Sequence, residues 1–171
     1  MELPKRKATR LKNYDYSLPA AYFITICVQN KLCILSKVTD DGELVLKSSG
    51  KIAANYIETI SDIFPNIKVH KYVIMPNHIH LILLVYENNG KLSYNSDSKY
   101  NDKESIVEAI GWFKYMTTKD INLSLKRQYS KVFQRSYHDH IIRGQKDYQK
   151  IWEYIQANPV LWKKDCFYPN K

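Results

Sequence analysis

Apolar residues along the chain follow two different spacings, which predict both strands and helices. Runs rich in β-branched and aromatic residues are typical of strands, whereas apolar residues that recur every three to four positions are typical of helices. Strands are predicted at 21–28, 43–46, 69–75 and 78–86, and a short hairpin between 132–133 and 141–142. Helices are predicted at 52–60, 106–121 and 146–158, the first ending before Pro65 and the last at Pro159.

The order of these elements predicts an α+β fold. An antiparallel sheet with helices packed against it, as in ferredoxin-like and RRM-like domains, accounts for this order. Residues 1–13 are expected to form a basic N-terminal arm, and residues 14–171 a single domain. Residues 87–103 are polar and are expected to form a long loop within that domain. Such a fold class says nothing about function by itself.

Two histidines stand two residues apart in an apolar run that extends from Tyr72 to Val85. Residues i and i+2 of a strand share a face, so His78 and His80 are expected to point into one space, close enough to share a metal ion. The run is otherwise apolar on both faces, which is typical of a central strand. Buried imidazoles need partners, and two interpretations stay open: a metal or catalytic pair, or two histidines satisfied within the core.

The last predicted helix carries a tyrosine outside its apolar stripe. That stripe is formed by Tyr148, Ile151, Trp152 and Ile155. On a helical wheel Tyr154 lies away from these residues, on the same side as Asp147 and Lys150. Asn158 follows four residues later, one turn along the same face. On wheel geometry alone, an ordinary surface tyrosine accounts for this pattern better than a functional one does.

Charge and cysteine content narrow the class of protein. The chain has 171 residues and a formal net charge of +9, which favours a polyanionic partner such as nucleic acid. Its three cysteines form neither a disulfide framework nor a zinc-binding spacing, and a reducing cytoplasm is expected. The charged N-terminus does not fit a secretory signal, and no apolar stretch is long enough to span a membrane.

Five short sequence motifs occur in this order: Tyr-Asp-Tyr at 14–16, Ala-Tyr-Phe-Ile-Thr-Ile-Cys at 21–27, Val-Ile-Met-Pro-Asn-His-Ile-His at 73–80, Phe-Gln-Arg-Ser-Tyr-His-Asp-His-Ile-Ile-Arg at 133–143, and Tyr-Ile-Gln-Ala-Asn-Pro at 154–159. Together they resemble motifs of the REP-associated tyrosine transposases, which are single-tyrosine HUH transposases related to the IS200/IS605 group. The likeness extends from about residue 6 to residue 162.

The resemblance implies a metal-dependent endonuclease and strand transferase that acts on single-stranded or hairpin DNA. His78 and His80 match the metal ligands of the family, Tyr154 its nucleophile, and Asn158 the position of a polar third ligand. The implied cofactor is a divalent metal, Mg²⁺ or Mn²⁺, with histidine ligands favouring Mn²⁺. The implied intermediate is a 5′-phosphotyrosine, formed during transposition of palindromic repeats.

Basic residues are expected to hold the DNA backbone. These are Lys5, Arg6, Lys7, Arg10, Lys12, Lys114, Arg135, Arg143 and Lys150. A second pair of histidines, His138 and His140, is interpreted as structural or DNA-facing. A monomer is favoured over a dimer, because no long apolar face is left over.

Two other functions fit parts of the sequence. A non-catalytic single-stranded nucleic-acid-binding module of ferredoxin-like fold would need the charge and the aromatic residues but not the histidines. A small hydrolytic metalloenzyme would need a base or a third strong ligand, and the sequence shows neither beside the histidine pair.

Overall fold

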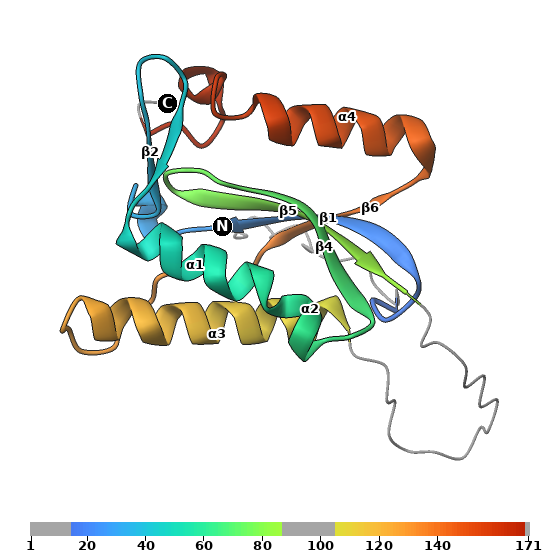
Figure 1. Cartoon of the computed structure of the whole chain (residues 1–171), viewed down its shortest axis with the longest axis horizontal. Coiled ribbons are helices and arrows are strands. Elements are labelled where there is room, and N and C mark those ends of the chain that lie inside the picture. Colours follow the sequence, from blue (N-terminus) through green and yellow to red (C-terminus); the bar gives the residue numbers. More distant parts are fainter. Residues whose placement is uncertain (1–14, 87–104, 170–171) are drawn as a thin grey trace, which may run out of the picture.

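In the described part of the chain, residues 15–86 and 105–169 of a computed structural model, four strands form one antiparallel sheet (Figure 1). They are β1 (Ala20–Cys27), β4 (Ile67–Ile74), β5 (His78–Val85) and β6 (His138–Ile142), arranged in the order β4-β5-β1-β6. The strands β1 and β5 are central, and β4 and β6 form the edges. This arrangement confirms the predicted antiparallel α+β fold.

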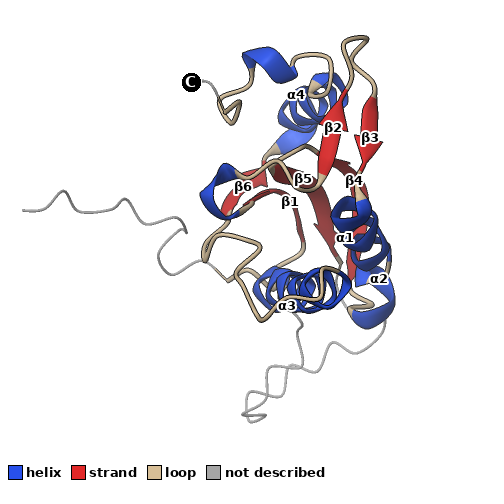
Figure 2. Ribbon diagram, turned by 90° about the vertical axis from the view of Figure 1, so that its left-hand side faces the viewer, coloured by secondary structure: helices blue, strands red, loops and turns tan. Residues whose placement is uncertain are grey.

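Helices cover the sheet on both faces, as Figure 2 shows. The helices α1 (Ser48–Glu58), α2 (Ile60–Ile63) and α3 (Ile106–Ser124) lie on one face, which we call the inner face. The helix α4 (Gly144–Ala157) lies on the opposite, outer face. Ser105 caps α3 by accepting from the backbone N–H of Glu108, whose carboxylate accepts from the Ser105 N–H in return.

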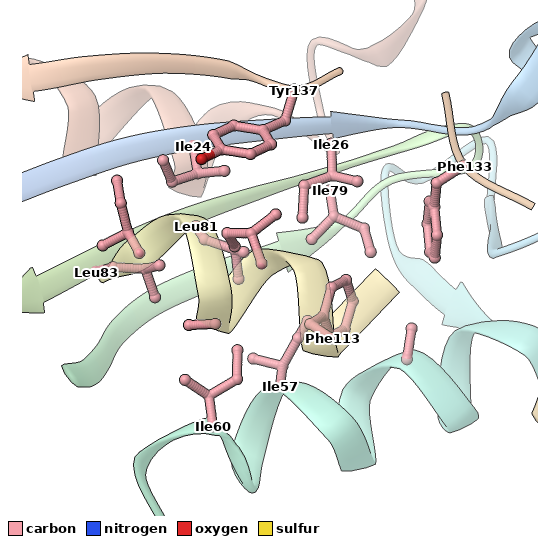
Figure 3. Packing of buried hydrophobic residues seen from close by; sticks show 14 of the residues in the cluster. Ile24, Ile26, Ile57, Ile60, Ile79, Leu81, Leu83, Phe113, Phe133 and Tyr137 are labelled. Carbon is pink, nitrogen blue, oxygen red and sulfur yellow. The ribbon is translucent and has the colours of Figure 1, made fainter. Parts of the chain in front are cut away.

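The larger hydrophobic core lies between the inner face and helices α1 and α3 (Figure 3). Alternate residues of the central strands point into it, because side chains alternate across a strand. Its fully buried members include Ile24, Ile26, Ile79, Leu81, Leu83, Ile57, Ile60 and Phe113. The other residues of β1 and β5 face α4, and the histidine pair is among them.

A smaller cluster lies under α4 on the outer face. It includes Val73, Ile82, Ile142, Ile155 and Trp162. Among the described residues of α4 only Ile155 is buried, so this helix is held by a narrow contact. The predicted apolar stripe of α4 therefore does face the sheet, as the partly buried Ile151 and Trp152 also indicate.

The structure differs from the predicted elements in two places. A small antiparallel pair, β2 (Ser36–Val38) with β3 (Leu44–Leu46), stands beside the sheet, and only its second strand was predicted. The predicted hairpin between 132–133 and 141–142 is wrong. Phe133 instead bridges Val28, just beyond β1, and β6 pairs along β1 itself. Both segments therefore pair along the same edge of the buried strand β1 and not with each other.

Short 3₁₀ helices follow β1 and α4, at Gln29–Lys31 (η1) and Trp162–Lys164 (η2). The predicted basic arm at 1–13 and the predicted loop at 87–103 lie outside the described residues. The division into an arm and one domain stays a prediction. Within the described ranges, no helix has the length and apolar character needed to cross a membrane.

Candidate metal centre and tyrosine site

The two histidines of β5 lie side by side on the outer face of the sheet. His78 pairs with Cys27 and His80 with Thr25 of β1, so both rings lie over the middle of the sheet. Their ring centroids are 4.5 Å apart, and both residues are buried. The strand β5 begins at His78, directly after the turn that contains Pro76 and Asn77. The alternation along the strand thus places the histidine pair as predicted.

The side chain of Asn77 fixes the protonation of the His78 ring. Its amide nitrogen Nδ2 donates to the carbonyl oxygens of Lys31 and Phe167, at 3.3 and 2.8 Å. The amide oxygen Oδ1 therefore faces Nδ1 of His78, at 2.9 Å, and must accept a proton from it. In a neutral imidazole this leaves a lone pair on Nε2, the atom that would bind a metal.

His80 is oriented in a similar way. Its Nδ1 lies 2.8 Å from Oγ1 of Thr25, and its Nε2 lies 3.3 Å from the hydroxyl oxygen of Tyr154. When Tyr154 donates its proton to Nε2, Nδ1 carries the ring proton and donates to Thr25. Both histidines then present an Nε2 lone pair toward the same space above the sheet.

Burial keeps both imidazoles neutral. It lowers the pKa of His78 to about 4, although the nearby carboxylate of Asp165 opposes this effect. Burial also lowers the pKa of His80 well below its ordinary value, and the neighbouring His78 adds to this. A metal ligand must be unprotonated, so both rings are ready to bind a cation at neutral pH.

A carboxylate that the sequence analysis did not identify completes the cluster. Asp165 follows η2 and is buried beside the histidines. Each residue of the cluster offers one ligand atom, and these atoms lie within 4.8 Å of one another. The cluster consists of His78, His80 and Asp165. The backbone N–H of Phe167 donates to Oδ1 of Asp165, at 2.6 Å, and thereby orients the carboxylate.

Asn158, the predicted third ligand, lies in the same cluster. Its Nδ2 donates to Oδ2 of Asp165, at 3.3 Å. Its Oδ1, like Nε2 of His78, is buried and has no hydrogen-bond partner among the described residues. Unpaired buried polar atoms are costly, and a bound cation would satisfy both. Two imidazoles, one carboxylate and one amide oxygen therefore fit a divalent metal ion.

Tyr154 lies at the edge of this cluster, on α4. Its ring packs edge-on against His80, with centroids 5.2 Å apart, while 41% of the residue stays exposed. Partial burial raises the pKa of its phenol, and the carboxylate of Asp165 raises it further. The hydroxyl is thus protonated at neutral pH in the absence of added positive charge. It lies next to the histidines and is also open to solvent.

The predicted DNA contacts have different surroundings. Arg135, Arg143 and Lys150 are exposed. Lys114 is half-buried, and its ammonium donates to the carbonyl oxygens of Gln134 and Arg135, at 2.7 and 2.9 Å. Lys114 thus also supports the segment that leads into β6. The five basic residues at positions 5, 6, 7, 10 and 12 lie outside the described residues.

Comparisons with known proteins agree with this architecture. The chain is 35% identical over 173 residues to an uncharacterised protein of Haemophilus influenzae, covering 95% of this chain and 93% of that protein. It belongs to the family of that Haemophilus protein. No family model matches the chain.

A solved structure shares the fold. It is a REP-associated tyrosine transposase bound to a REP hairpin, with a TM-score of 0.59 and 18% sequence identity. The similarity covers 88% of this chain and 73% of that one. The α+β fold implied by the sequence motifs is therefore confirmed.

Proposed function

We propose that the protein is a metal-dependent single-stranded DNA endonuclease and strand transferase with Tyr154 as its nucleophile. The observation that carries this proposal is the distance of 3.3 Å between the hydroxyl oxygen of Tyr154 and Nε2 of His80. The same nitrogen belongs to the cluster of His78, His80 and Asp165. A nucleophile beside a cation site is the arrangement that phosphoryl transfer needs.

In the proposed reaction, the hydroxyl oxygen of Tyr154 forms a bond to phosphorus and the bond from phosphorus to O3′ breaks. The products are a 5′-phosphotyrosine and a free 3′-hydroxyl, with the phenol proton formally transferred to the 3′ oxygen. Because the covalent link conserves the energy of the phosphodiester, the 3′-hydroxyl of another strand reverses the step and joins the ends. This sequence of cutting and joining serves transposition without ATP.

A divalent cation held by His78, His80 and Asp165, with Asn158 beside them, would supply the positive charge that the phosphoryl oxygens and the phenolate require. Mg²⁺ and Mn²⁺ both serve such reactions, and imidazole ligands favour Mn²⁺. The protein's own contribution is to hold the ligands. Asn77 and Thr25 fix the rings from the Nδ1 side, and the N–H of Phe167 fixes the carboxylate.

The proposed substrate is a DNA hairpin with a single-stranded flank, and the exposed Arg135, Arg143 and Lys150 are expected to contact its backbone. The structural neighbour bound to a REP hairpin supports this substrate class. A net charge of +9 supports a polyanionic partner. We further propose that the protein acts as a monomer.

A covalent-adduct assay tests this function. Labelled hairpin DNA with single-stranded flanks, taken from palindromic repeats of the source genome, is incubated with protein and Mn²⁺ and separated on a denaturing gel. We expect an adduct that needs the metal and disappears in Tyr154→Phe. Tyr115→Phe, which changes an exposed tyrosine of α3, is the matched control and should retain it.

DNA binding without an adduct, unchanged by His78→Ala, would contradict the nuclease and favour a non-catalytic binding module. An adduct that persists in Tyr154→Phe would assign the nucleophile to another residue. Loss of the adduct in His78→Ala with retained DNA binding supports the metal role.

A further inference from the structure

The outer face of the sheet beside Tyr154 carries three ring side chains that the proposed chemistry does not use. They are Phe23 of β1 and His138 and His140 of β6, and we call them the outer platform. In the register of the sheet, Phe23 lies opposite His140, and Thr25 lies opposite His138. Directly paired residues of antiparallel strands share a face. The platform therefore lies on the same face as the histidine pair and α4.

The platform is open because α4 is displaced toward the other edge of the sheet. The closest packing of α4 is against β4, whereas the platform belongs to β1 and β6 (Figure 2). Phe23 is partly exposed, and His138 and His140 are exposed. The side chain of His140 remains 53% accessible even though its Nε2 contacts Asp147 at the start of α4.

Phe23 connects this platform to the tyrosine site. Its ring stacks on His80, with centroids 5.1 Å apart and an interplanar angle of 29°. It also meets Tyr154 edge-on, with centroids 6.1 Å apart. A nucleotide whose phosphate lies at the hydroxyl of Tyr154 would have its neighbouring base within reach of Phe23. Proteins that bind single-stranded nucleic acid use aromatic side chains as surfaces on which unpaired bases stack.

We propose that the outer platform binds an unpaired base of the DNA next to the cleaved phosphate, with Phe23 as the stacking surface and His138 and His140 beside it. This inference rests on the proposed function and names the form of substrate that the site takes. A paired base cannot stack in this way, so the platform selects single-stranded DNA at the cleavage position. The exposed Arg143, just before α4, and Lys150, in the middle of that helix, are available for the flanking phosphates.

Moving a single abasic site along the DNA and measuring the affinity of the protein tests this inference without requiring cleavage. Tyr154→Phe protein is mixed with a DNA hairpin that carries a thymidine flank, in which one abasic site is moved along the flank, and affinity is measured by fluorescence anisotropy. We expect one position at which loss of the base weakens binding about tenfold. In Phe23→Leu combined with Tyr154→Phe, that position should lose its effect. Phe23→Trp should restore it, because an aromatic face returns.

A control variant and a crosslinking experiment distinguish the loss of base stacking from a general loss of structure. Tyr115→Leu removes an exposed aromatic from α3, on the opposite side of the sheet, and should keep the abasic profile. Mn²⁺ affinity of Phe23→Leu should match that of the parent, which excludes an effect through His80. A 5-iododeoxyuridine placed at the sensitive position should crosslink to the peptide that contains Phe23 or to that of His138 and His140.

An identical abasic profile in Phe23→Leu, a flat profile, or crosslinks confined to the other face would overturn the inference. Its failure is distinguishable from that of the proposed function. If the wild type forms no adduct but Phe23→Leu still abolishes the abasic effect, the nuclease proposal is wrong and base binding by the outer platform is supported. If the wild type forms an adduct but Phe23→Leu leaves the abasic profile unchanged, the nuclease proposal is supported and the inference about the outer platform is wrong.

Discussion

Asn77 holds the ring of His78 in a single tautomer. The amide nitrogen of Asn77 donates to two backbone carbonyls, so its oxygen can only face Nδ1 of His78. Those carbonyls belong to Lys31, just after β1, and to Phe167, near the C-terminal end. One side chain thus ties together two distant segments and prepares Nε2 for a metal ion.

Replacing Asn77 by alanine should therefore weaken metal binding without removing a ligand. The loss of one outer hydrogen bond to a metal-ligating histidine typically lowers affinity about 10- to 100-fold. Titration calorimetry with Mn²⁺ measures this effect. Asn55→Ala, on the exposed side of α1, is the matched control and should bind like the wild type. Equal affinities of Asn77→Ala and wild type would show that the tautomer is fixed in some other way.

Tyr154→Phe should bind the metal more tightly than the wild type. The lone pair of His80 Nε2 cannot accept a proton from Tyr154 and bind a cation at the same time. Metal binding must therefore break this hydrogen bond, and its removal should raise affinity about twofold to tenfold. Mn²⁺ electron paramagnetic resonance gives the free ion concentration directly. Weaker binding by Tyr154→Phe would instead identify the phenol oxygen as a ligand.

The carboxylate of Asp165 and the amide of Asn158 can be distinguished by their separate removal. Asp165→Asn removes a negative charge beside two imidazoles and should lower Mn²⁺ affinity on the order of 100-fold. Asn158→Ala should cost less, roughly tenfold, because it removes a neutral group that also orients Asp165. The opposite ranking would make Asn158 the principal third ligand. Asp40→Asn, at the exposed Asp40, serves as the control.

The metal-free protein should lose stability as the solution becomes acidic. Burial lowers the pKa of His78 in the folded protein to about 4, from an ordinary value of 6.5. Between these values the unfolded chain binds a proton that the folded chain does not, so stability present above pH 6.5 falls as the pH drops toward 4. The loss amounts to roughly 3 kcal/mol. Urea unfolding of wild type and His78→Gln measures it. The variant should show a shallower decline, and an equal decline in both would refute the assignment to His78.

Two glycines should respond oppositely to alanine. A Cβ at Gly50, in α1, would lie 2.1 Å from the carbonyl oxygen of Leu35, so Gly50→Ala should destabilise the fold by about 1–3 kcal/mol or more. A Cβ at Gly111, in α3, meets nothing within 4 Å, and Gly111→Ala should stabilise by about 0.5–1 kcal/mol. Thermal unfolding of both variants measures the difference. Similar melting temperatures would contradict the close approach at Gly50.

The histidine pair could be predicted from sequence because it depends on local geometry alone. Alternation along one strand places His78 and His80 on a common face, and no knowledge of the remaining fold is needed. Helical periodicity also predicts that Tyr154 lies off the apolar stripe, but only the family resemblance singled it out as a nucleophile. The structure adds the contact between them, which depends on how α4 lies over β5.

Asp165 could not be predicted because nothing local marks it. It follows a single 3₁₀ turn, next to two lysines, and its role comes from the path by which the C-terminal segment returns to the sheet. Its separation of seven residues from Asn158 matches no helical or strand spacing that would bring the two side chains into contact. The partner of β6 was missed for a related reason. Segments that are close in sequence are expected to pair with each other, but Phe133 bridges Val28 and β6 pairs with β1, so both lie along the same edge of β1.

The order in which the ribosome makes the chain has a consequence for this site. His78 and His80 leave the ribosome long before Tyr154, and Asp165 leaves later still. The return of the C-terminal segment joins these residues through Asn77, Phe167 and Asp165. A nascent chain that already carries the histidines therefore lacks both the nucleophile and the carboxylate. The proposed cutting of DNA therefore requires a chain that has been made and folded at least as far as Phe167.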